Sequence, residues 1–140
     1  MRQGRRQARE VALQALYAWQ LSRGDPLEEA RANEAYEKSA FVDELVRGVH
    51  GGAAELEKLI APHLDRPFAR LSPVERAILY IGTYELSAHP KTPFKVVLNE
   101  AVELGKSFGG AEGHRFINGV LEKIAEALRP EEVARSRKLV

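Results

Sequence analysis

Four arginines crowd the first nine residues of the chain, at positions 2, 5, 6 and 9. A guanidinium group binds phosphate in a bidentate manner and stacks on nucleic-acid bases. The apolar period of residues 5–22 predicts a helix, so these cations would sit at its N-terminal end, where the helix dipole disfavours cations and favours anions. We interpret Arg2, Arg5, Arg6 and Arg9 as a binding edge for an anionic partner. A frayed, solubilising terminus is the structural alternative.

The helical period also places these arginines relative to the core. On a helical wheel, Arg6 and Arg9 fall in line with the apolar stripe of Leu13, Leu16 and Tyr17, so we expect them to flank the seam of a helical bundle. Basic side chains interleaved with aromatic ones suit single-stranded nucleic acid, although one aromatic taken alone is more often part of a core. Tyr17 therefore has two readings, as core residue or stacking platform.

A second basic and aromatic group lies near the end of the chain. Its members are Lys106, Phe108, His114, Arg115 and Phe116. If the fold brings this group close to the first helix, the two would form one continuous site for RNA.

Charge is distributed unevenly along the 140 residues, although the net charge is only +1. Residues 1–23 hold five arginines and one acid, whereas residues 25–45 hold seven acids and two cations. Such asymmetry favours an anionic partner for the basic end. There is no cysteine, which excludes disulfides, thiol catalysis and Cys-ligated zinc and suits the cytoplasm. No apolar run reaches the length of a membrane span or a secretory signal.

Residues with catalytic potential do not converge in the sequence. Each of the four histidines stands alone near a helix end or loop, and none forms a metal-binding spacing with another histidine or a carboxylate. The paired glycines lack the Lys-Ser/Thr of a phosphate loop. We therefore predict no enzyme, no metal site and no cofactor.

Apolar periodicity predicts an all-α fold with five or six substantial helices, short connections and hence antiparallel neighbours in a bundle. The expected helices cover residues 5–22, 36–49, 56–63, 73–86, 93–108 and 112–128, with a polar turn or loose helical piece at 27–35. Residues 129–140 are expected to be a polar, mobile tail.

Local signals set the expected boundaries. Ser72, Pro73 and Glu75 form a capping box, and Thr92 and Pro93 repeat the start signal as N-cap and first helical residue. Gly51-Gly52 is expected to end a helix.

Two further glycines fall inside predicted helices. Gly82 costs about 1 kcal/mol relative to alanine, which a close neighbouring helix would compensate. Gly119 is likewise read as a packing contact inside the last helix.

Five segments, in this order and spacing, resemble the NusB family of transcription antitermination factors. They are RRQAREVALQALYAWQLS, FVDELVRGV, VERAILYIGTYEL, PFKVVLNEAVELGKSFG and FINGVLEKIA, which together cover residues 5–128. The resemblance implies one all-helical RNA-binding domain over 1–140, with about seven helices in two small bundles. It also implies binding to single-stranded boxA RNA of nascent ribosomal RNA transcripts, jointly with the ribosomal protein NusE, in the RNA polymerase antitermination complex. Family members are monomers or homodimers.

The resemblance also implies roles for individual residues. The arginine-rich start of the family falls on Arg5, Arg6 and Arg9, and its NusE-facing surface on the predicted helices 73–86 and 93–108. RNA-facing positions of the last loop and helix fall on Phe108, Glu112, Arg115, Phe116 and Asn118, and partner-facing positions on Glu75, Tyr84, Glu85 and Glu103. The arginine run is less dense here than is usual in the family, and GGAEGH loosens the last loop.

Two alternatives remain open at this stage. The same fold serves as the front domain of a ribosomal RNA cytosine methyltransferase, which would require this chain to be a truncated form. The acidic segment 25–45 and the near-neutral total charge also fit a helical adaptor that binds only proteins.

Overall fold

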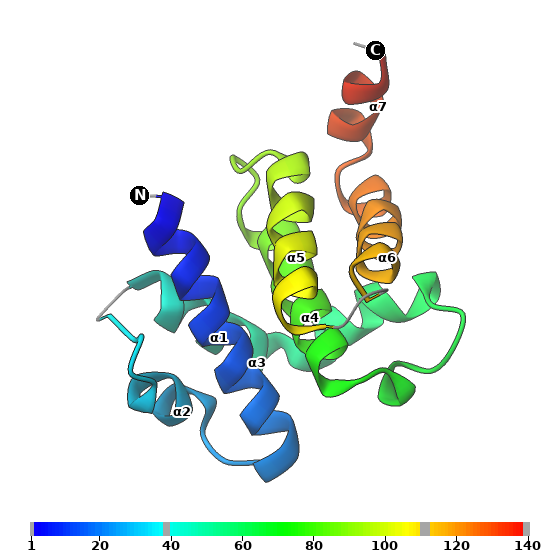
Figure 1. Ribbon diagram of the computed structural model, residues 1–140. Helices are drawn as coiled ribbons and strands as arrows, with labels where there is room; N and C mark the ends of the chain where they lie inside the picture. Colours follow the sequence, from blue (N-terminus) through cyan, green and yellow to red (C-terminus); the bar gives the residue numbers. More distant parts are fainter. Residues whose placement is uncertain (1, 38–39, 110–112, 139–140) are drawn as a thin grey trace.

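The structure is a computed structural model that describes residues 2–37, 40–109 and 113–138. These residues form seven α-helices and two short 3-10 helices, and no strand occurs among them, which confirms the all-α prediction (Figure 1). The helices are α1 (Arg2–Ser22), α2 (Pro26–Ala32), α3 (Ala40–Ile60), α4 (Pro73–Ala88), α5 (Phe94–Phe108), α6 (Gly113–Leu128) and α7 (Pro130–Lys138), with the 3-10 helices η1 (Ala61–His63) and η2 (Phe68–Arg70) between α3 and α4.

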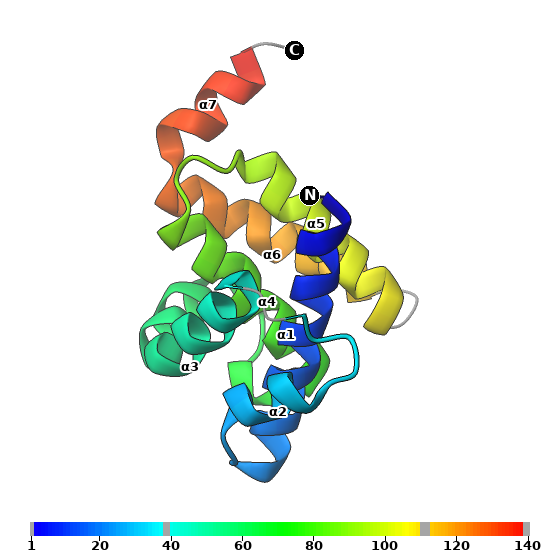
Figure 2. The same ribbon diagram turned by 90° about the vertical axis from the view of Figure 1, so that its left-hand side faces the viewer.

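The helices pack in two groups that share one apolar core. Helices α1, α2 and α3 contact one another, as do α4, α5 and α6, and α4 joins the groups through contacts with α1 and α3. Figure 1 shows α5 standing between α1 and α6, and both views show α7 extending beyond the second group (Figures 1 and 2). Leu16, Leu45, Ile78, Leu79 and Leu121 have no exposed side-chain surface and lie at the centre of the core.

The first helix boundaries follow from local chemistry. Arg23 adopts a left-handed φ of 63° and ends α1. The carboxylate of Asp25 then accepts a hydrogen bond from the backbone N–H of Leu27 (2.9 Å) and caps α2, with Pro26 in the first turn. The segment expected to be a polar turn or loose piece is thus a short, capped helix.

The capping box at the start of α4 is confirmed. The Ser72 hydroxyl accepts from the backbone N–H of Glu75 (3.1 Å), and the Glu75 carboxylate accepts from the backbone N–H of Ser72 (3.3 Å). The α4 helix that follows is buried along most of its length, as its apolar sequence predicted.

The break predicted at Gly51-Gly52 is present inside α3. The backbone angles of Gly52 (φ −113°, ψ 15°) are not helical, so α3 consists of two helical segments that meet at a kink there. Leu56 and Ile60, in the segment beyond the kink, are buried. This second segment ends at Ile60 and is followed by η1, where the sequence predicts a separate short helix at 56–63.

The start of α5 also differs from the prediction. Pro93, and not Thr92, occupies the N-cap position, and it makes no side-chain capping bond. The Glu132 carboxylate of α7 instead accepts from the backbone N–H of Phe94 (2.8 Å). A residue far away in sequence supplies the cap, which a local signal cannot reveal.

The expected mobile tail contains a helix. Pro130–Lys138 form α7, and its Val133 is buried. Just before α7, the buried guanidinium of Arg129 donates to the backbone carbonyls of Glu85 (3.3 Å), Leu86 (3.1 Å) and His89 (2.8 Å) at the end of α4. The carbonyls of Glu85 and His89 also accept from the backbone N–H groups of His89 (3.0 Å) and Thr92 (3.0 Å), and Arg129 adds a cation, which is favoured at this end of a helix.

The two helix-interior glycines have opposite surroundings. A Cβ atom on Gly82 would lie only 2.9 Å from Leu121 of α6, which confirms the predicted close approach. Around Gly119 no atom lies within 4 Å of the corresponding position, so the predicted packing contact is wrong.

Candidate nucleic-acid interface

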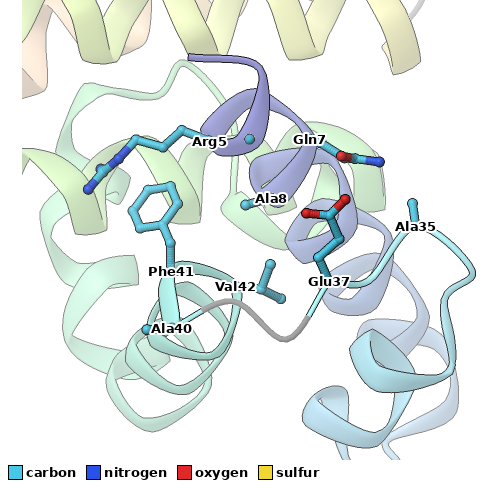
Figure 3. Close-up of a pocket in the computed structure, with 9 residues that line it drawn as sticks. Arg5, Gln7, Ala8, Ala35, Glu37, Ala40, Phe41 and Val42 are labelled. Atoms are coloured by element: carbon cyan, nitrogen blue, oxygen red, sulfur yellow. The ribbon is translucent and has the colours of Figure 1, made fainter. Parts of the chain in front are cut away.

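The exposed Arg5 side chain lies beside the first turn of α3. Its guanidinium carbon is 4.3 Å from the centroid of the Phe41 ring, a cation–π distance. The two side chains border a cavity of about 310 Å³ between α1 and the start of α3. Figure 3 shows Arg5 and Phe41 on one side of this cavity, Gln7 and Glu37 on the other, and Ala8 between them. A cation stacked on an aromatic ring beside an open cavity is suited to a phosphate or a base.

Arg6 is also at the surface, but it is held by an acid of α5. Its Nε and Nη2 atoms donate to the two carboxylate oxygens of Glu100, at 3.3 and 3.0 Å. The Arg6 side chain remains 53% exposed, whereas Glu100 is 18% exposed. An RNA phosphate can therefore reach Arg6 only in competition with Glu100.

Arg9 is buried, so the prediction that it lies on an exposed RNA-binding edge is wrong. Its Nε and Nη2 atoms each donate to the Glu85 carboxylate at 2.9 Å, and the two side chains are 5% and 2% exposed. The helical wheel predicts that Arg9 flanks the seam between the helices. In the structure Arg9 is buried within that seam. Glu85, predicted to face a protein partner, is buried for the same reason.

A hydrogen-bonded cluster adjoins this seam. Glu44 of α3 accepts from the Tyr84 hydroxyl (2.8 Å) and bonds to Nε2 of His89. Burial raises the pKa of Glu44, but these two hydrogen bonds outweigh it and hold the pKa of Glu44 below its ordinary value. Burial and the bond to Glu44 raise the pKa of Tyr84 to about 12. The partly buried Tyr84 thus helps to pack α3 against α4.

The remaining N-terminal candidates differ in exposure. Tyr17 is 39% exposed and lies at the margin of the buried face of α1, so it is open to a partner. The backbone of Arg2 begins α1, and the position of its side chain lies outside the described part of the structure.

The second predicted surface lies around the facing ends of α5 and α6. Phe108 and Phe116 are partly buried against the core, and Arg115 is exposed. The guanidinium carbon of Arg66 lies 5.3 Å from the centroid of the Phe116 ring. The Asn118 amide donates to Glu122 (3.2 Å). Glu112 lies outside the described residues.

The two predicted RNA surfaces are separate. Arg6 pairs with Glu100 in the middle of α5, whereas Phe108 lies eight residues later, roughly 12 Å farther along the helix axis. The second surface instead adjoins the start of α4, because Gly113 lies beside the Glu75 carboxylate. RNA that used both surfaces would have to run along α5.

Two predicted partner-facing acids are accessible. Glu75 is partly exposed while it closes the capping box, so both of its predicted roles are compatible. Glu103 is 45% exposed and pairs with Lys106 at 3.8 Å.

Sequence reasoning missed Phe41 and Glu100 at the arginine edge. Phe41 fits the apolar period of its helix, and a single glutamate such as Glu100 indicates only a solvated helix face. Neither pattern reveals a partner, because the arginines that these residues contact lie far away in sequence.

Within the described ranges, histidines and acids form no group of three that could hold a metal ion. Across the same residues, none of the helices combines the length and apolar character needed to cross a membrane.

Comparisons with known proteins match this geometry to one family. The sequence model of the NusB family matches residues 6–126. The transcription antitermination proteins NusB of Burkholderia mallei (strain SAVP1) and Burkholderia thailandensis are each 48% identical over 138 residues, which is 95% of this chain and 95% of theirs.

Solved structures agree with this match. NusB of T. maritima has a TM-score of 0.83 at 29% identity and covers 93% of this chain and 96% of its own. A chain from a crystal structure of the antitermination factors NusB and NusE with double-stranded RNA has a TM-score of 0.81 at 28% identity, covering 91% of this chain and 99% of its own. By sequence and by fold, this chain belongs to the NusB family.

Proposed function

We propose that this chain is a transcription antitermination factor that binds boxA RNA of nascent ribosomal RNA transcripts together with NusE, within the RNA polymerase antitermination complex of the cytoplasm. The observation that carries the proposal is the near full-length match to relatives that are transcription antitermination proteins. The fold of a NusB chain seen with NusE and RNA supports it. The whole chain acts as one RNA-binding domain.

The arginine edge contributes to RNA binding mainly through Arg5. This guanidinium is exposed, lies 4.3 Å from the Phe41 ring centroid, and opens on the cavity of Figure 3. Arg6 joins when a phosphate displaces Glu100, and Arg9 supports the edge from within. Tyr17, which is 39% exposed on α1, is a further candidate contact, and Arg2 is one from the sequence alone.

The second RNA surface consists of Phe108, Arg115, Phe116 and Asn118, and Glu112 is proposed as an RNA contact from the family resemblance alone. Aromatic faces next to a cation suit unstacked bases of a single strand. Of the acids predicted to face NusE, Glu75 and Glu103 remain accessible, and Tyr84 is partly buried. An acidic surface of this kind complements a basic ribosomal protein.

A mobility-shift titration with single-stranded boxA RNA, with and without NusE, tests the proposal. We expect binding that NusE strengthens. The slope of the logarithm of the binding constant against the logarithm of the salt concentration should be about −3 if roughly four phosphates are contacted. Arg5→Ala should weaken binding and flatten the slope, whereas the exposed Arg47→Ala on α3 should leave both unchanged.

Two outcomes would contradict the proposal. NusE binding without any effect of RNA would favour the protein-binding adaptor. RNA binding with an unchanged salt slope in Arg5→Ala would remove Arg5 from the interface.

A further inference from the structure

A groove of about 400 Å³ runs between the segment 62–65, at the end of η1, and the outer face of α6. Arg115 and Phe116 line it at the start of α6, and Gly119 and Lys123 line it one and two turns later. The groove therefore begins at the second RNA surface and leads away from it along α6.

Gly119 has no structural explanation within the described chain. It lies inside α6, where glycine is less favourable than alanine. Its position is exposed, and no atom lies within 4 Å of the place where a Cβ would stand. The absent side chain leaves the floor of the groove open at this point.

The walls of the groove carry cations and one aromatic face. Arg115 and Lys123 are exposed on α6, and Arg66 places its guanidinium carbon 5.3 Å from the Phe116 ring centroid. The acid on this side is Asp65, which pairs with Arg66 at 3.1 Å. Burial is minimal here, and the bond from Arg66 holds the pKa of Asp65 below its ordinary value, so this acid is ionised and its charge is offset by Arg66.

We propose that this groove seats a nucleotide of the bound RNA, with its base over Gly119 and against Phe116, and its phosphates near Arg115 and Lys123. The inference rests on the proposed RNA-binding function and extends it to the 62–66 segment and to Gly119. A nucleotide fits these walls better than an acidic peptide does, because a planar base can use both the Phe116 ring and the open space above Gly119. The groove is also continuous with the second RNA surface.

Two substitutions at one position test this proposal. Gly119→Leu fills the groove, whereas Gly119→Ala adds a single methyl group for which there is space. Fluorescence anisotropy with labelled single-stranded boxA RNA and equimolar NusE should give a roughly tenfold higher Kd for Gly119→Leu. Gly119→Ala should bind within about twofold of wild type and melt at an equal or higher temperature.

A charge variant tests the groove without filling it. Lys123→Ala should flatten the salt slope by about 0.7, the contribution of one phosphate on a single strand. The matched control is Lys91→Ala, an exposed lysine in the turn after α4. Circular dichroism melts of all four variants verify that each is folded.

The outcomes separate this inference from the proposed function. If wild type shows no salt-dependent RNA binding with or without NusE, the proposed function and the groove assignment both fail. If Arg5→Ala weakens RNA binding while Gly119→Leu and Lys123→Ala match wild type, only the groove assignment fails. If Gly119→Leu loses NusE binding measured without RNA while its RNA affinity is unchanged, the groove binds a protein and the inference is overturned.

Discussion

Arg6 and Arg9 lie one turn apart on α1, and each makes a bidentate pair with a glutamate of the second helical group. Arg9 and Glu85 are 5% and 2% exposed, whereas Arg6 is 53% exposed beside Glu100. The chemistry of the two pairs is the same, but their distance from solvent differs. The inner pair, Arg9–Glu85, joins the two helical groups. In the outer pair, Arg6–Glu100, the arginine is exposed, so an RNA phosphate can replace Glu100 as its partner.

The buried pair should show the largest effect on stability. Glu85→Ala leaves the buried Arg9 charge with only the more distant Glu100 carboxylate (3.5 Å), and removal of one partner of a buried ion pair costs about 3–5 kcal/mol in comparable sites. Urea denaturation of wild type and variant measures this difference in the free energy of unfolding. Because an apolar pair of similar size often replaces a buried ion pair at little cost, the double variant Arg9→Met/Glu85→Leu should recover much of the loss.

This comparison would fail if Glu85→Ala lost less stability than Glu100→Ala. That result would mean that water reaches the inner pair, and that the seam between the two groups is not closed.

A third arginine sharpens the comparison because its partners are mainly backbone carbonyls. Arg129→Ala removes the side-chain donor of the carbonyls of Leu86 and Thr92 and leaves those of Glu85 and His89 with their backbone donors alone, for an expected loss of about 2–3 kcal/mol. Amide hydrogen exchange should show faster exchange at the end of α4 and in α7. Arg129→Lys retains the charge but cannot span three carbonyls, so we expect it to recover only a minor part of the loss. Full recovery by lysine would show that charge alone matters at this site.

These pairs also show where sequence reasoning ends. The capping box at Ser72 was predictable from a local sequence pattern. The close contact at Gly82 was predictable because a glycine inside a helix is less favourable than alanine and needs a compensating contact. The cap of Phe94 by Glu132 was not, since its acceptor lies 38 residues away. The wheel placed Arg9 in the seam, but only the tertiary fold shows that Glu85 meets it there. Phe41 beside Arg5 was missed for the same reason.

The outer pair should affect RNA binding more than folding. Glu100→Gln removes the charge that competes for Arg6, so RNA affinity should rise by about threefold and the salt slope should steepen. The pair with the exposed Arg6 contributes little to stability, but Glu100 also lies 3.5 Å from Nη1 of the buried Arg9, so we expect a loss of stability that is smaller than that of Glu85→Ala. Glu103→Gln is the matched control, since Glu103 lies on the same helix and pairs with Lys106 at 3.8 Å.

If Glu100→Gln and Glu103→Gln change RNA affinity equally, the effect comes from the lower negative charge of the surface and not from the release of Arg6. An Arg6→Ala/Glu100→Gln double variant with the affinity of Arg6→Ala alone would show that Glu100 acts through Arg6.

We expect the smallest effect on stability from the cluster of Glu44, Tyr84 and His89 beside the seam, and only at acidic pH. The pKa of Glu44 is lower in the folded protein than in the unfolded chain, so the stability that its ionised form contributes is complete above about pH 4.5 and is lost as the pH falls through the lowered pKa. The Glu44 side chain is 43% exposed, so solvent screening keeps this contribution small. Melting temperatures between about pH 6 and pH 3 should therefore fall less steeply for Glu44→Gln than for wild type. Glu132, whose pKa is lowered by the Phe94 backbone and Arg129 against the effect of burial, titrates in the same window and remains in both proteins. Identical slopes would mean that the bonds from Tyr84 and His89 to Glu44 do not persist in solution.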